Sequence, residues 1–330
     1  MTKTPHIASA LLVAMTALAA GGAQAANSIN LANYQLAGNY ALDTLSDMGL
    51  EASAVTYARD RLDSNGNQGT LFFVGDEGLG VVEISRTGQT LGSMSFNWTG
   101  TSSSNDDAEG LTYLGNGQLV VVDERPQIAY QFTFANGGSV TLNNQPKVAI
   151  TGSTTSVGNS GTEGISYDSV SGKFYSVKQD NPAQLRRSDL TFAVGFGSAT
   201  TEILFSGQSS VFDLNSLSDL QTLSSVEALD GTAAADNLLI LSLDSKKLIE
   251  LDPTTGTTLS SLDLSGLTSQ AIEGVTVDHL GNIYLVAEDS GTPNSRLFVL
   301  SAPVPEPETY ALMLAGLGLV GFMARRRNAN

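Results

Sequence analysis

The amino-acid sequence predicts an all-β protein, a β-propeller of five four-stranded blades, and three observations lead to that fold. Five segments repeat one order: an acid, a short strand, a Gly/Asn/Asp turn, a more apolar strand and further acids. The second strands, such as "LVVV" (119–122) and "LLIL" (238–241), are continuously apolar, as expected for strands covered on both faces. Glutamates in four segments lie 54, 64 and 46 residues apart, which suits blades with variable loops.

The repeated hairpin segments begin at residues 51, 106, 161, 224 and 270. A third strand follows each hairpin, for example "GVVEISRTG" (80–88), and most units add a fourth, such as "QTLGSMSF" (89–96). The fifth unit stops after its third strand, "SRLFVLSAP" (295–303). We expect "NYQLAGNYAL" (33–42) to supply the missing outer strand and close the ring, so that no strand edge stays exposed. Six blades is the alternative, if residues 180–224 contain a further unit.

Four stretches of these repeats carry a family resemblance. They are "DDAEGLTYLGNGQLVVVDER", "GKFYSVKQDNP", "LLILSLDS" and "AIEGVTVDHLGNIYLVAED". They resemble successive repeats of the SdiA-regulated (YjiK-like) family, and the likeness runs from about residue 49 to 301. The resemblance implies a β-propeller, whose domain we place at residues 26–303, and no defined reaction, because that family lacks one.

The first 25 residues have the layout of a secretory signal peptide. A charge at Lys3 precedes the apolar run "IASALLVAMTALAA", and the small-residue sequence "AQA" ends at Ala25. The apolar run is too short for a spanning helix with these flanks. We therefore expect export and cleavage by signal peptidase after Ala25.

The last residues, 304–330, read as a short membrane anchor. An uncharged stretch over 309–324 predicts a single transmembrane helix, followed by an Arg cluster at 325–327. Sixteen residues span roughly 24 Å at about 1.5 Å each, less than the roughly 30 Å of a typical hydrocarbon core. The positive-inside rule keeps the Arg cluster in the cytoplasm and the folded body outside. Hydropathy alone also allows a permanent tail anchor.

The order of sequence features in this C-terminal tail resembles that of a known sorting signal. Pro305, Glu306 and Pro307 precede the apolar stretch, and Arg325, Arg326 and Arg327 follow it. This order resembles the PEP-CTERM sorting signal of Gram-negative bacteria. The resemblance implies an inner-membrane-anchored precursor, recognition by an exosortase, removal of the tail, and release or attachment at the cell surface.

The composition of the body excludes several kinds of site. Residues 26–303 hold 12 Lys+Arg and 31 Asp+Glu, a formal net charge of −19, once Lys3, the Arg cluster, Glu306 and Glu308 are set aside. That charge argues against a nucleic-acid partner. The chain has no cysteine, and His279 is the only histidine after residue 25, which removes disulfides, thiol chemistry and most zinc sites. We place His279 in a hairpin turn on the face opposite the acids.

The acids recur at both ends of the hairpins and predict a ring at one mouth of the central channel. Inner strands of a propeller begin, and second strands end, on the same face. The candidate metal ligands are Glu109, Glu163, Glu227 and Glu273 on inner strands, with Asp123 and Glu288 at second-strand ends. Asp76 and Asp244 also follow second strands, and Lys178 replaces the acid in the third unit. Oxygen ligands without Cys or a nearby His favour Ca²⁺ or Mg²⁺, and we expect Ca²⁺.

Three function classes remain open from the sequence. The first is a non-catalytic binding protein of the cell surface or extracellular matrix, whose partner is a surface protein or a polysaccharide, with a cation in the acidic mouth. The second is a calcium-dependent hydrolase of lactonase or phosphoesterase type, with Glu109 or Asp123 as the base. In the third, the module is purely structural and the acids accept backbone N–H bonds between blades.

Overall fold

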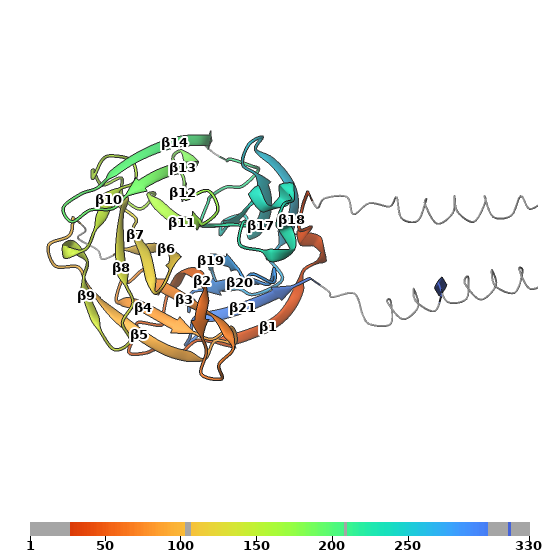
Figure 1. Ribbon diagram of the computed structural model, residues 1–330, viewed down its shortest axis with the longest axis horizontal. Helices are drawn as coiled ribbons and strands as arrows, with labels where there is room; N and C mark the ends of the chain where they lie inside the picture. The colour runs from red at the N-terminus through yellow and green to blue at the C-terminus, as the bar shows by residue number, and fades with distance from the viewer. Residues whose placement is uncertain (1–26, 103–106, 208–209, 303–315, 318–330) are drawn as a thin grey trace, which may run out of the picture.

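The computed structural model describes residues 27–102, 107–207, 210–302 and 316–317 of the 330-residue chain. Five four-stranded units surround a central channel (Figure 1). The predicted five-bladed propeller is therefore confirmed, and the six-blade alternative is wrong, because residues 183–222 supply only two outer strands of one blade and the inner strand of the next.

The strands run outward from the channel in chain order in blades 1 to 4, whereas in blade 5 the N-terminal strand is outermost, and all pairs within a blade are antiparallel. Blade 1 consists of β2 (Ala52–Leu62), β3 (Gln68–Gly75), β4 (Gly80–Ile84) and β5 (Thr90–Asn97); blade 2 of β6 (Ala108–Gly115), β7 (Gln118–Asp123), β8 (Ile128–Thr133) and β10 (Lys147–Ala149); blade 3 of β11 (Thr162–Asp168), β12 (Lys173–Lys178), β13 (Ala183–Thr191) and β14 (Ser198–Gly207); blade 4 of β15 (Asp219–Thr222), β16 (Leu238–Ser242), β17 (Lys247–Asp252) and β18 (Thr257–Asp263); blade 5 of β19 (Ile272–Val277), β20 (Ile283–Ala287), β21 (Arg296–Ser301) and β1 (Gln35–Ala41).

Short elements connect these strands. The strand β9 (Ser139–Thr141) leaves blade 2 and pairs in parallel with β5 at the outer edge of blade 1. The 3₁₀ turns are η1 (Leu31–Asn33), η2 (Leu142–Asn144), η3 (Glu227–Leu229) and η4 (Ala233–Asp236).

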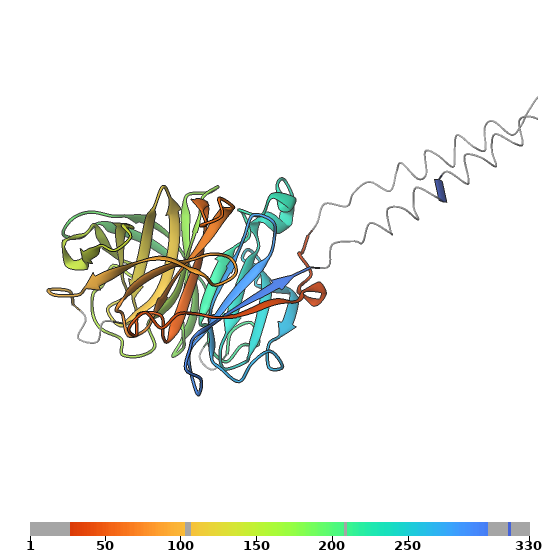
Figure 2. The same cartoon turned by 90° about the horizontal axis from the view of Figure 1, so that it is seen from below.

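The N-terminal strand closes the ring as the sequence predicts. β1 pairs antiparallel with β21, and the register places Gln35 opposite Ser301 and Ala41 opposite Arg296. The N-terminal segment and β21 lie side by side on the rim in both views (Figures 1 and 2). Blade 5 therefore combines one strand from the N-terminal end of the propeller with three strands from its C-terminal end, and this closes the ring.

The core lies between the faces of neighbouring blades. The second strands are buried along nearly all of their length: Leu119 to Val122 in β7 and Leu238 to Leu241 in β16 are at most 1% exposed. This agrees with their continuously apolar sequence. The blades also approach closely near the channel, where a Cβ at Gly274 of blade 5 would lie 2.9 Å from the Cα of Ala54 in blade 1.

The fourth blade differs from the sequence prediction at its inner strand. We expected residues 224 onward to form the hairpin, with Glu227 on the inner strand. The inner strand is instead β15, and residues 223–237 form a long connection that contains η3 and η4. Glu227 therefore lies in η3, away from the acids of the other blades. The repeat pattern missed this strand because it assumes a short turn between the inner strand and the second strand, whereas residues 223–237 separate β15 from β16.

Neither terminal targeting segment can be compared with its prediction. The signal peptide at 1–25 and nearly all of the tail at 304–330 lie outside the described residues. In the part of the chain that the structure describes, no helix has the length and apolar character needed to cross a membrane.

Candidate functional site: an acidic channel mouth

The inner strands share one local irregularity that sets the direction of their acids. Each of β6, β11 and β19 carries a bulge at a glutamate: Glu109, Glu163 and Glu273. The bulge in β2 is at Ser53. A bulged residue has no partner in the ladder, and the bend redirects its side chain. The sequence predicted these three glutamates, and the structure gives all three the same backbone environment.

The equivalent residue in blade 4 is Asp219, not Glu227. In every blade this position lies three residues before a buried or nearly buried Thr or Ser near the channel, and its members are Ser53, Glu109, Glu163, Asp219 and Glu273. Their spacings of 56, 54, 56 and 54 residues are nearly constant. Asp219 is 2% exposed and its Oδ2 accepts the backbone N–H of Val275 in blade 5 at 2.8 Å. In blade 4 the acid therefore links two neighbouring blades, which is the role that the purely structural alternative gives to these acids.

The three bulge glutamates act on one another electrostatically. Burial, followed by the nearby carboxylates of Glu273 and Asp76, raises the pKa of Glu109 well above its ordinary value. Burial and then the charge of Glu109 do the same for Glu163. The pKa of Glu273 is raised to about 9, first by burial and then by Glu288. These side chains, from three blades, therefore meet at one end of the channel.

Further acids join them there, and we call the whole set the acidic mouth. Its members are Glu51, Asp76, Glu77, Asp107, Glu109, Glu124, Glu163, Glu273 and Glu288. Burial raises the pKa of Asp76, and that of Glu124 is raised to about 7, again first by burial. Carboxylates this close disfavour each other's charged form unless a proton or a cation is shared.

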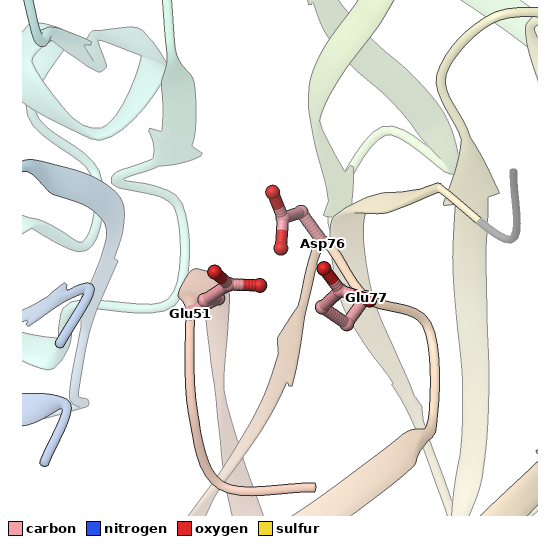
Figure 3. Close-up of side chains that lie close together, drawn as sticks. All are labelled: Glu51, Asp76 and Glu77. Carbon is pink, nitrogen blue, oxygen red and sulfur yellow. The ribbon is translucent and has the colours of Figure 1, made fainter. Parts of the chain in front are cut away.

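Among the described residues, three of these acids lie close enough together to hold one ion. One carboxylate oxygen from each of Glu51, Asp76 and Glu77 lies within 4.8 Å of the other two (Figure 3). Interaction with the Asp76 carboxyl, and then burial, raises the pKa of Glu51 to about 8. The Oε2 atom of Glu51 and the Oδ1 atom of Asp76 are buried and, apart from the interaction between these two carboxyls, accept no hydrogen bond from any described residue. Such a group offers several oxygen ligands to one hard cation.

The two acids at second-strand ends that were predicted as metal ligands, Glu288 and Asp123, have different surroundings. Glu288, after β20, is half-buried, and its charge acts on Glu273. Asp123 is fully buried at the end of β7 and acts on Tyr130 of β8, whose pKa is raised by burial and then by this charge. The next residue, Glu124, faces Glu163 instead. Alternate residues of a strand point to opposite faces, so Glu124, and not the predicted Asp123, faces the acids of the inner strands.

Two cations offset part of the charge. The Nε atom of Arg125 donates to Asp107 Oδ2 at 2.6 Å and lies 4.0 Å from Glu124 Oε2. Lys178, 7% exposed, donates to the backbone oxygen of Asp180, and burial lowers the pKa of its ammonium. The acids outnumber these two cations in the described part of the mouth, so a net negative site remains.

Comparison with known proteins agrees with this architecture. Residues 26–298 match the family model described as SdiA-regulated, and residues 303–327 match the PEP-CTERM protein-sorting motif. The structure is similar to glutaminyl cyclase of Myxococcus xanthus, with 14% identity and a TM-score of 0.51 over 83% of this chain and 97% of that one. It is also similar to the WD40 propeller domain of Doa1, with 11% identity and a TM-score of 0.45 over 82% and 97%. At these identities the likeness concerns the fold alone.

Proposed function

The chain belongs to the SdiA-regulated family, and from that premise we propose that it is a non-catalytic binding protein of the cell surface or extracellular matrix that holds Ca²⁺ in its acidic mouth. The sorting motif supports the location, because it implies export, membrane-anchored sorting and processing by an exosortase. The partner would be a surface protein or a polysaccharide.

The observation that carries the cation is the pair of buried oxygens in Figure 3. Glu51 Oε2 and Asp76 Oδ1 accept no hydrogen bond from any other described residue, and two ionised carboxylates buried side by side cost free energy. Glu77 completes the group within 4.8 Å. These three residues would hold the ion, and Ca²⁺ suits them because it takes six to eight oxygens in flexible geometry. A bound cation would also relieve the repulsion among the bulge glutamates.

Thermal unfolding of the full chain in CaCl₂ or EDTA tests the calcium site. Calcium at 100 times its dissociation constant should stabilise the fold by about 2.7 kcal/mol. Asp76→Asn should abolish that stabilisation. Asp244→Asn is the matched control, because Asp244 also follows a second strand but is exposed. Equal melting temperatures of the wild type in CaCl₂ and EDTA would exclude the site.

Two further measurements test the non-catalytic role and the processing by an exosortase. Turnover of lactone or phosphoester substrates by the calcium-loaded protein, lost in Asp76→Asn, would replace the non-catalytic proposal by the hydrolase alternative. Mass spectrometry of the exported protein tests the sorting: we expect chains that begin at Ala26 and lack the Arg cluster. An exported chain that still ends at Asn330 would contradict exosortase processing.

A further inference from the structure

A cavity of about 870 Å³ lies on the hairpin-turn side of the channel, away from the acidic mouth. Residues from all five inner strands and from the long connection of blade 4 line it. The lining includes Tyr57, Tyr113, Tyr167, Gln221, Glu227 and His279. Pockets that hold small ligands usually measure about 300–1,000 Å³, so the cavity has the size of a binding site.

The first tyrosine is fixed in place by its neighbours. Tyr57 Oη lies 2.7 Å from Nδ1 of His279, and the two rings stack with centroids 5.8 Å apart at 15°. Gly69 makes room for this ring: its φ is +91°, and a Cβ there would lie 2.2 Å from Tyr57 Oη. A left-handed glycine at this contact is what lets the backbone pass the ring so closely.

The second tyrosine is held by a polar network. Tyr113 Oη donates to Asp60 Oδ1 at 2.6 Å and accepts the backbone N–H of Gly117 at 2.7 Å. The other oxygen of Asp60 accepts the backbone N–H of Asn116 at 2.7 Å. Because protein groups occupy both of these tyrosine hydroxyls, what the rings offer to a ligand is mainly their aromatic surface.

The charged side chains that line the cavity argue against several classes of ligand. Three carboxylates line it, those of Asp60, Glu227 and Asp230, against the single guanidinium of Arg59. An anion would therefore be repelled. Arg59 pairs with Glu227 across the cavity wall, from β2 to η3. Glu227 is paired with Arg59 and both oxygens of Asp60 accept hydrogen bonds, so of the three carboxylates the exposed Asp230 is the one left to contact a cation. A wholly apolar ligand would leave the polar lining without hydrogen bonds.

We propose that this cavity binds neutral saccharide units. A sugar ring has apolar C–H faces that pack on tyrosine rings, and its hydroxyls both donate and accept hydrogen bonds, as the Gln, Ser and Thr side chains of the lining do. The proposal rests on the binding role proposed above and names its ligand class, but it does not depend on the cation, because cavity and acidic mouth lie at opposite ends of the channel.

Isothermal titration of the full chain, in a detergent without a sugar head group, tests the proposal with cellotriose, maltotriose, galactotriose and mannotriose. We expect one of them to bind with one-to-one stoichiometry. Tyr167→Ala and Asp60→Ala should each weaken that binding at least tenfold, and Tyr167→Phe, which keeps the ring, less than threefold. Phe196→Ala is the matched control, since Phe196 is an exposed aromatic (48%) that does not line the cavity.

Asp60 is exposed, so its variant should fold even if loss of the half-buried Tyr167 ring perturbs blade 3. No binding of any of the four sugars, unchanged affinity in both alanine variants, or binding of tetramethylammonium that Tyr167→Ala abolishes would each overturn the saccharide proposal. Calcium stabilisation measured on the same samples separates the two proposals. If calcium stabilises a protein that binds no sugar, only the saccharide inference fails.

Discussion

Oγ1 of Thr112 in blade 2 accepts the backbone N–H of Tyr167 in blade 3 at 2.9 Å. The same contact recurs around the channel. Thr56 accepts from Tyr113 at 3.1 Å, Ser166 from Thr222 at 3.2 Å, and Thr276 from Tyr57 at 3.1 Å. At the junction of blades 4 and 5, Asp219 accepts from Val275 instead. A ring of short side-chain acceptors therefore links every pair of neighbouring blades next to the channel.

Removing one such acceptor should weaken the ring. Thr112→Val keeps the shape of the side chain but leaves the N–H of Tyr167 without its acceptor beside a buried position. We expect a loss of about 1–3 kcal/mol in the free energy of unfolding, measured by urea denaturation. Thr200→Val, at an exposed site on β14, should change it by less than about 0.5 kcal/mol. Equal losses in both variants would argue against the linking role.

The two acids of blade 4 should differ sharply in their effect on stability. Asp219→Ala removes the acceptor of two backbone N–H groups, those of Leu220 and Val275, from a buried site. We expect it to cost about 2–4 kcal/mol. Glu227→Ala removes only an ion pair whose side chains are about half exposed, which contributes about 0–1 kcal/mol. Urea denaturation of both variants measures the difference, and a larger loss for Glu227→Ala would contradict the assignment of Asp219 to the ring position.

The N-terminal segment is held by a buried carboxylate. Glu250 of β17, 0% exposed, accepts the backbone N–H of Ile29 at 3.0 Å, the amide of Asn237 at 2.8 Å and the hydroxyl of Ser260 at 2.8 Å. Glu250→Ala leaves these donors without an acceptor, and we expect a loss of about 3 kcal/mol or more.

Hydrogen exchange distinguishes this local effect from a general one. In Glu250→Ala the amides of Ile29 and Leu31 should lose protection before those of β16 do. Glu202→Ala, which breaks the exposed pair with Arg187, serves as the control and should leave both regions protected. Uniform loss of protection across blade 4 would show that Glu250 supports the sheet rather than the N-terminal segment.

The acidic mouth should make stability depend on pH when calcium is absent. The folded-state pKa values of Glu124, Glu51 and Glu273 are raised to about 7, 8 and 9, above the ordinary value of 4.5. Between 4.5 and these values the folded state binds more protons than the unfolded state, so stability falls as pH rises. Each carboxyl contributes at most about 1.4 kcal/mol per pH unit in that window.

Melting curves in EDTA from pH 5 to pH 9 measure this dependence. The melting temperature of the wild type should fall across the range, and Glu273→Gln should make the fall shallower, because it removes the residue with the widest window. Saturating calcium should also reduce the fall, since the ion replaces the shared protons. A melting temperature that rises over this range in EDTA would contradict the placement of these carboxyls.

Much of the fold could be predicted from the sequence because its signals are local. The alternation and apolar runs of strands such as 119–122 depend on neighbours a few residues away, and so do the turns between them. The repeat also indicated the inner-strand glutamates Glu109, Glu163 and Glu273. It failed at Glu227, because a long connection interrupts blade 4 and the pattern gives no measure of connection length.

The sequence by itself determined the five-bladed ring, its closure by residues 33–42 and the presence of acids at one channel mouth. Only the tertiary structure decided which acids meet, that Glu51, Asp76 and Glu77 come close together, and that Asp219 links two blades. The physical reason is distance along the chain. Strand patterns arise from adjacent residues, whereas the channel mouth combines side chains as far apart in the chain as Glu51 and Asp76 or Glu109 and Glu163, whose directions depend on bulges and on how the blades pack.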